Sequence, residues 1–158
     1  AAAREASADK KSLGKEAQEA LLARRYGRRH LHIREQDDLE QRVRQILDED
    51  LDSFCWSLDF GEDFIIRLFT RGFLPICSST KLRSGRTVYV LLPKLHRQRS
   101  VLRQLHELHV DKGARKRSKR YRLTVDSAFE RVVAGCIEQH GESWLWPPMR
   151  RALSSAFR

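Results

Sequence analysis

The chain has 158 residues, and its 31 lysines and arginines exceed its 21 aspartates and glutamates, giving a formal net charge of +10. Its longest apolar stretches, such as Val88–Pro93, fall far short of the ~20 residues that span a bilayer, so we expect no membrane-spanning segment. The three cysteines are odd in number and widely spaced, which argues against a disulfide scaffold and favours a reducing compartment.

The positive charge is concentrated in one stretch of the chain. Residues 94–122 hold eleven basic and two acidic side chains, a net charge of +9. Residues 1–50 and 123–158 are each neutral overall, and residues 51–93 carry +1. A local basic block predicts a polyanionic partner better than a diffuse surplus does, and nucleic acid is the leading candidate.

The first 50 residues are predicted to form helices with narrow apolar stripes. The first stripe ends at Leu21, shortly before a cluster of arginines around Gly27, and a second stripe spans residues 39–47. Such stripes bury little surface, so we expect these helices to lie on a partner or on the rest of the chain. The start of the chain has no initiator Met and no apolar signal region, which fits a processed protein. The first stripe consists of Leu13, Ala17, Ala20 and Leu21.

The next segment is predicted to hold one helix followed by a β-hairpin. Asp59–Glu62 offers a cap for the helix, and Gly72 stands where a glycine would end it. Two extended runs follow, Phe73–Ser78 and Thr87–Pro93, and the connection between them is rich in turn-forming residues.

The last third of the chain is predicted to alternate between short elements. Its clearest helix begins at a capping-box pattern, Ser127–Glu130, and is closed by Gly141. Two prolines, Pro147 and Pro148, sit at the start of a final helix. The predicted order is a helical or irregular stretch over 101–108, a short strand Tyr121–Val125, the capped helix, and the final helix running to Arg158.

Few patterns in the sequence point to catalysis. No glycine loop has phosphate-binding spacing, and no cysteine pair has metal-ligand spacing. The pairs His106/His109 and His30/His32 lack a third ligand nearby in sequence, so we predict no metal site. No Ser/His/Asp or Cys/His arrangement is recognisable, so we predict no catalytic residue and no cofactor.

The basic run 112–122 is the one strong chemical signal. Lysine and arginine at this density neutralise phosphates and release counterions. A solvated loop or a localisation signal would also be basic, but only Glu107 and Asp111 offset the run, which favours nucleic-acid contact. Tyr121 could stack on a base, although its place at a predicted strand start favours core packing. The predicted RNA-binding residues are Lys112, Arg115, Lys116, Arg117, Lys119, Arg120, Arg122, Arg97, Arg99 and Arg103.

Five short motifs occur together between Phe54 and Phe157. They are Cys-Trp-Ser-Leu-Asp-Phe-Gly-Glu-Asp-Phe at 55–64, Arg-Gly-Phe-Leu-Pro at 71–75, Leu-His-Val at 108–110, Tyr-Arg-Leu-Thr-Val-Asp-Ser-Ala-Phe at 121–129 with Gly-Cys at 135–136, and Ser-Trp-Leu-Trp-Pro at 143–147. In this order and spacing, the series resembles the first half of the leucyl/phenylalanyl-tRNA–protein transferase family.

The resemblance implies a fold and a function. That family takes an aminoacyl-tRNA as donor and moves Leu or Phe onto an N-terminal Arg or Lys, and it pairs a small N-terminal domain with an acetyltransferase-like (GNAT-type) domain. By resemblance, Trp144 is a candidate for the aromatic pocket, although composition alone favours a loop pinned to the core. Ile76 and Leu153 depart from the family's aromatic positions.

The resemblance also implies that the family's catalytic segment would lie beyond Arg158. Two explanations fit: the sequence is a fragment of a longer enzyme, or a partner completes a truncated domain. The predicted fold class is α+β, with a helical N-terminal extension (1–50), a small α/β-hairpin domain like the transferases' N-terminal domain (51–93), and the first part of an acetyltransferase-like α/β domain (94–158).

Three functions are therefore compared. We favour a non-catalytic, transferase-derived RNA-binding protein in a large ribonucleoprotein, with rRNA or tRNA and neighbouring protein subunits as partners. An organellar, mitochondrial ribosome or its assembly machinery would suit it, and a cytoplasmic location is the alternative. The second candidate is an active aminoacyl-tRNA–protein transferase, which leaves enzymatic activity open. A DNA-binding regulator is the weakest, because no helix-turn-helix or zinc spacing supports it.

Overall fold

The computed structural model describes residues 14–82 and 85–157. Leu13 of the predicted first stripe, part of the hairpin turn and the predicted end of the last helix at Arg158 lie outside the described residues. The elements, in chain order, are α1 (Lys15–Tyr26), β1 (Leu31–His32), α2 (Leu39–Asp48), β2 (Cys55–Trp56), α3 (Glu62–Thr70), β3 (Phe73–Lys81), β4 (Thr87–Leu95), the 3₁₀ turn η1 (Leu105–Glu107), α4 (Lys112–Ser118), α5 (Phe129–His140) and α6 (Pro147–Phe157).

The predicted hairpin is confirmed and forms the centre of the fold. Strands β3 and β4 pair antiparallel over nine residues each, with Phe73 opposite Leu95 and Lys81 opposite Thr87. Strand β2 lies along the free edge of β4, where Ser57 and Leu91 exchange backbone hydrogen bonds of 2.8 and 2.9 Å. Strand β1 pairs parallel with β2 in a second two-stranded sheet, which isolated bridges from Phe54 and Ser57 join to the edge of β4.

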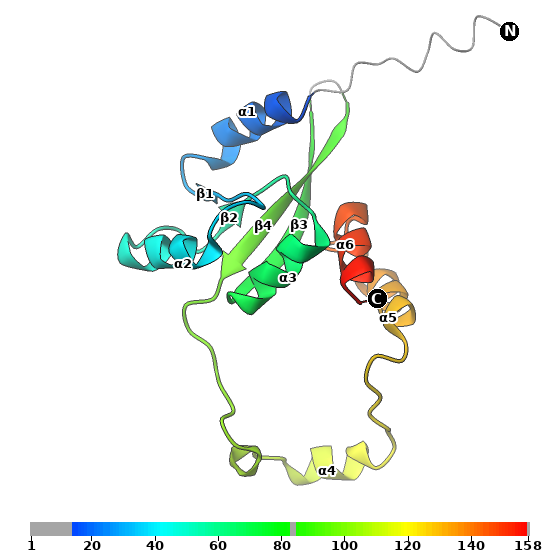
Figure 1. The fold of residues 1–158 in the computed structure, drawn as a ribbon. Helices are drawn as coiled ribbons and strands as arrows, with labels where there is room; N and C mark the ends of the chain where they lie inside the picture. The colour runs from blue at the N-terminus through cyan, green and yellow to red at the C-terminus, as the bar shows by residue number, and fades with distance from the viewer. Residues whose placement is uncertain (1–13, 83–84, 158) are drawn as a thin grey trace, which may run out of the picture.

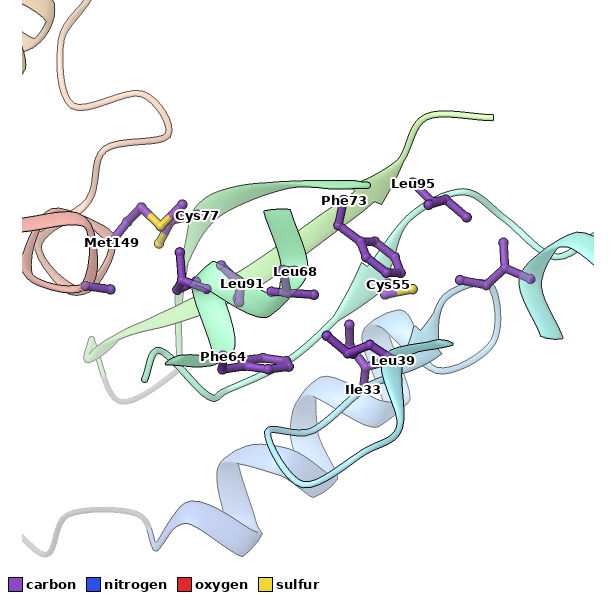
Figure 2. Packing of buried hydrophobic residues seen from close by; sticks show 13 residues of the cluster. Ile33, Leu39, Cys55, Phe64, Leu68, Phe73, Cys77, Leu91, Leu95 and Met149 are labelled. Carbon is purple, nitrogen blue, oxygen red and sulfur yellow. The ribbon is translucent and has the colours of Figure 1, made fainter. Parts of the chain in front are cut away.

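One face of the hairpin carries the larger core. Because side chains alternate along a strand, Leu91 and Leu95 of β4 share this face. They pack with Phe64, Ile65 and Leu68 of α3 and with Met149 and Ala152 of α6 (Figure 2). Ile33, Leu39 and Ile46 from the first 50 residues join the same cluster. The core thus draws on all three predicted segments, and the division into domains stays a prediction.

The opposite face of the hairpin carries a smaller cluster, to which α1 contributes Leu22. Val88 and Val90 pack there with Trp56 and with Leu22 of α1. The stripe predicted for this helix was wrong, because Leu21 is exposed and Leu22 is buried. Leu22 lies on the same face of α1 as Tyr26 and packs against the indole of Trp56. Burial of this large side chain, rather than of the alanines, determines which face of α1 points to the core.

The helix caps differ from those predicted. Asp59 does not cap α3, whose first residue follows Gly61 without a side-chain cap. The predicted capping box before α5 is also absent, since Ala128 occupies the cap position and no side chain bonds to it. Gly72, with φ of +88°, and Gly141, with φ of +71°, do end their helices as predicted. The start of α6 at Pro147 is also confirmed.

Beyond β4 the chain leaves the core and rejoins it only at α6, whose Met149 and Ala152 are buried, while α5 buries none of its residues (Figure 1). The predicted strand Tyr121–Val125 is wrong: these residues are exposed, irregular chain, and no strand lies beside them among the described residues. The mixed α+β class is confirmed by six α-helices with two small sheets among the described residues. The acetyltransferase-like character of the last segment stays a prediction.

Candidate nucleic-acid interface

A long exposed segment carries the predicted RNA-binding residues. It spans residues 96–128, from the end of β4 to the start of α5, and is called the basic arm below. Every residue of the arm is exposed except Gly113, Ala114 and Ala128, which are half-buried. Connections of this length without packed structure are uncommon in compact domains and are usually functional loops or linkers. The arm is therefore the first place to look for a binding surface.

Helix α4 is the α-helix within the basic arm. Asp111 caps the helix, because its Oδ1 accepts a hydrogen bond of 2.8 Å from the backbone N–H of Ala114. The helix has seven residues and buries none of them. It thus presents lysine and arginine side chains on every side rather than on one packed face.

The basic side chains of α4 and of the residues after it have no acidic partner. Within the described part of the chain, none of the ion pairs involves these side chains. Unpaired ammonium and guanidinium groups at close spacing attract phosphates, and the guanidinium fork can bind two phosphate oxygens at once. The seven residues are Lys112, Arg115, Lys116, Arg117, Lys119, Arg120 and Arg122.

Two other predicted RNA-binding residues anchor the first residues of the basic arm to the rest of the protein. The guanidinium of Arg97 pairs with Asp50 and donates to the carbonyl oxygens of Ile46, at 3.3 Å, and Leu51. The guanidinium of Arg99 donates to the carbonyl oxygen of Gly72. Their donors thus face protein oxygens, which distinguishes them from the seven unpaired residues. Arg103 stays exposed on the arm.

The basic arm also exposes apolar side chains. Leu105 is 85% exposed, Leu123 89% and Tyr121 78%, and Val101, Leu108 and Val125 are exposed as well. Single exposed apolar residues are ordinary, but several of them in one segment are typical of an interaction surface. The sequence alternation at 121–125 had suggested a strand, and in the structure the same residues are available to a partner.

No family model, curated protein sequence or solved structure matches this chain. The resemblance to the transferase family therefore remains a prediction from the five motifs. Among residues 14–82 and 85–157, no helix is long and apolar enough to cross a membrane. The same residues hold no group of three or more His, Cys, Asp or Glu side chains placed to hold a metal ion.

The predicted pocket residue Trp144 lies outside the basic arm, between α5 and α6. It is 41% exposed, in the turn that leads to α6. Its neighbour Leu145 is buried, and Trp146 packs against Tyr89 with ring centroids 5.8 Å apart. Leu145 and Trp146 thus hold this loop against the core. A role for Trp144 in a pocket stays a prediction.

A second group of polar residues was missed by the sequence analysis. His32 stacks on Trp56 with ring centroids 3.8 Å apart and planes 7° from parallel. The two residues are register partners on the parallel strands β1 and β2, so their side chains share one face. The signal in the sequence was the arginine cluster around Gly27, which precedes His30 and His32. The contact of His32 with Trp56 could not be predicted from the sequence, because it depends on the pairing of β1 with β2.

Proposed function

We propose that this protein is a non-catalytic RNA-binding component or assembly factor of a large ribonucleoprotein, with an organellar (mitochondrial) ribosome as the first candidate. The observation that carries the proposal is the set of seven basic side chains without acidic partners on the basic arm. The arm lies outside the core, so it is free to follow the surface of a partner. Arg97 and Arg99 fix the point from which it leaves the domain.

The chemistry gathered on the arm is that of binding. Lysine and arginine side chains stay protonated at neutral pH, so they supply charge and hydrogen-bond donors rather than proton transfer. Tyr121, exposed beside Arg120 and Arg122, adds a ring on which an unpaired base can stack. Unpaired bases are common in RNA loops, which favours RNA over duplex DNA.

The exposed apolar residues of the arm favour a complex over a free RNA. A ribonucleoprotein offers phosphates to the basic residues and protein surfaces to the leucines and valines. Within this proposal, residues 51–93 are a transferase-like domain retained as a scaffold, and residues 94–158 derive from the beginning of an acetyltransferase-like domain. Both statements rest on the five sequence motifs.

Salt-dependent RNA binding tests the proposal. Fluorescence anisotropy with a single-stranded RNA of about 20 nucleotides should show a logarithmic salt slope of about −0.7 for each phosphate neutralised. The variant R115Q/K116Q/K119Q should reduce the slope by about 2 and the affinity at low salt by roughly tenfold or more. The matched control, K81Q/R86Q/R131Q, removes three positive charges outside the arm and should change both values much less.

Two results would count against the proposal. The first is a wild-type chain that binds no RNA at physiological salt, and the second is an equal loss of affinity in the arm and control variants. A leucine transfer from Leu-tRNA to a peptide that begins with arginine would instead favour an active transferase.

A further inference from the structure

Some hydroxyl groups of this chain follow an arginine at a distance of three residues. A protein kinase that selects basic substrates binds an arginine at this position through its own carboxylates, so the pattern marks candidate phosphorylation sites. Among residues 14–82 and 85–157 the pattern occurs at Thr70, Ser100, Ser118 and Ser154. The sequence does not distinguish these four residues, but the contacts of each arginine and each hydroxyl do.

At Thr70 and Ser100 the preceding arginine is already engaged with the protein. Arg67, before Thr70, donates two 2.7 Å hydrogen bonds to backbone oxygens of the segment between β1 and α2. Arg97, before Ser100, pairs with Asp50 and donates to backbone oxygens of α2 and the loop after it. A kinase would have to break these contacts before it could bind either guanidinium group.

At Ser154 the hydroxyl itself is engaged. Ser154 is half-buried on α6, and its Oγ donates a hydrogen bond to Oε1 of Glu130 on α5. The helix packs on the core through Met149 and Ala152, so a kinase that binds its substrate as an extended chain would have to unfold it. This site is therefore closed for a different reason from the first two.

Ser118 has both an accessible hydroxyl and an accessible arginine. It is the last residue of α4, which lies away from the core (Figure 1), and its side chain is exposed. The guanidinium group of Arg115 makes no ion pair or hydrogen bond with another described residue. The basic residues Lys116 and Arg117 stand between the two.

The structural role of the Ser118 hydroxyl is a bond within its own helix. Its Oγ donates a 2.9 Å hydrogen bond to the carbonyl oxygen of Arg115, as serines near helix ends commonly do. Helix α4 has seven residues and buries none of them, so it opens at little cost in free energy. The bond therefore does not withhold the hydroxyl from a kinase.

A phosphate group on Ser118 would weaken the attraction of the basic arm for RNA. Residues 112–122 hold seven basic and no acidic side chains, and a phosphoserine adds a charge of about −1.5 to −2 among them. Its oxygens can accept hydrogen bonds from Arg115 and other neighbouring cations, which compete with the phosphates of RNA. It would also stand at the carboxyl end of α4, where the helix dipole disfavours negative charge. We propose that Ser118 is a phosphorylation site and that its modification releases the basic arm from RNA.

The modification requires a serine kinase and ATP. The γ-phosphoryl group of ATP forms a bond to Oγ of Ser118, and the bond between its phosphorus and the oxygen that bridges to ADP breaks. ADP leaves with the electron pair of that bond, and a base of the kinase takes the hydroxyl proton. The effect on RNA rests on the proposed function, whereas the modification itself does not.

Phosphorylation of the full chain tests the site. The chain is incubated with ATP and the catalytic subunit of cyclic-AMP-dependent protein kinase, which selects arginine three residues before serine, and mass spectrometry locates and quantifies the phosphates. We expect Ser118 to be modified about tenfold faster or more than Ser100 and Ser154, because its arginine and hydroxyl are both accessible. R115Q should slow the reaction at Ser118 by a similar factor, and the matched control R122Q, which removes one positive charge after the serine, should change it much less.

Three results at this stage would overturn the proposal. They are the absence of phosphate on Ser118, equal rates at Ser118, Ser100 and Ser154, and equal effects of R115Q and R122Q. The first would show that the kinase does not reach the arm, and the other two that the contacts of the arginines do not select the site.

RNA affinity before and after the modification tests the regulation. The phosphorylated chain should bind single-stranded RNA about tenfold more weakly at physiological salt, because about two fewer RNA phosphates are neutralised. Phosphatase treatment should restore the affinity, and S118A treated with the same kinase should keep it. An unchanged affinity after complete modification would overturn this inference and leave the proposed function standing. A chain that binds no RNA before modification would contradict the proposed function, and the regulation with it.

Discussion

The Nζ of Lys15 lies 2.5 Å from Oδ1 of Asp59, which joins the first turn of α1 to the chain that follows β2. The other carboxylate oxygen of Asp59 accepts a 2.9 Å hydrogen bond from the backbone N–H of Glu35. Asp59 is only 9% exposed, while the side chain of Lys15 is largely in solvent. One buried carboxylate thus links α1, the segment after β1 and the sheet.

Replacing this carboxylate should loosen α1. We expect Asp59→Asn to lower the free energy of unfolding by about 1–3 kcal/mol, because the buried side chain loses the negative charge that strengthens both of its hydrogen bonds. Lys15→Gln should cost less than about 1 kcal/mol, because the Lys15 side chain is largely in solvent and a glutamine amide can still donate a hydrogen bond to Asp59. Urea denaturation of both variants measures the difference. A Lys15 variant as unstable as the Asp59 variant would contradict the assignment of the linkage to Asp59.

Acid should destabilise the same region in two stages. Burial lowers the pKa of His32 below its ordinary 6.5, more than nearby Glu19 raises it. A histidine with a lowered pKa contributes stability that is complete above 6.5 and is lost as the pH falls through the lowered value. Burial alone would raise the pKa of Asp59, but the hydrogen bonds from Lys15 and Glu35 prevail and lower it below 3.8. Its contribution is therefore lost only at lower pH.

Urea midpoints measured from pH 8 to pH 4 test the first stage. The midpoint should fall below about pH 6.5 in the wild-type chain, and His32→Gln should flatten that part of the profile. The control His140→Gln changes an exposed histidine at the end of α5 and should leave the profile as it is. An unchanged profile in the His32 variant would show that another group is responsible.

The elements that were predicted correctly are those whose signals are local. The two extended runs that form β3 and β4, the glycines Gly72 and Gly141 and the proline start of α6 each depend on a few neighbouring residues. One error came from long-range contacts. Asp59 was assigned to the cap of α3, but Lys15 and Glu35 engage it across 44 and 24 residues.

For the basic arm too, local features were predicted and long-range contacts were not. Its charge was evident in the sequence, and the structure adds which residues are unpaired. Arg97 and Arg99 resemble the other arginines in sequence, yet Arg97 pairs with Asp50 and both donate to backbone oxygens of α2, the loop after it or the turn after α3. A carbonyl oxygen is present at every residue, so no side-chain pattern can indicate which ones are used.

The three cysteines should differ sharply in reactivity. Burial raises the pKa of both Cys55 and Cys77 to about 12, which leaves almost no thiolate at neutral pH. Cys136 is exposed on α5. A thiol reagent at pH 8 should therefore titrate one thiol rapidly in the folded chain and all three in denaturant. Cys136→Ser should abolish the rapid phase, and a rapid phase that persists would contradict the burial of the other two.

Cutting the basic arm should leave the core assembled. Its exposed lysines and arginines are the first sites that trypsin should reach, while Met149 and Ala152 of α6 stay buried against α3 and β3. The two fragments should therefore elute together in size-exclusion chromatography after a brief digestion. Met149→Ala should weaken their association, since such truncations cost about 2–5 kcal/mol, and Met149→Leu should preserve it. Separation of the wild-type fragments would show that α6 does not belong to this core.

Helix α4 should gain order when RNA binds. Seven residues are too few for a stable isolated helix, and like charges four residues apart repel each other until phosphates neutralise them. The helical circular dichroism signal should therefore rise on addition of RNA, and the cap should control how far. Asp111→Ala removes the bond to Ala114 and should weaken RNA binding about fivefold relative to Asp111→Asn, which keeps an oxygen for the cap and loses the same charge. Equal affinities of the two variants would show that the arm binds RNA without forming α4.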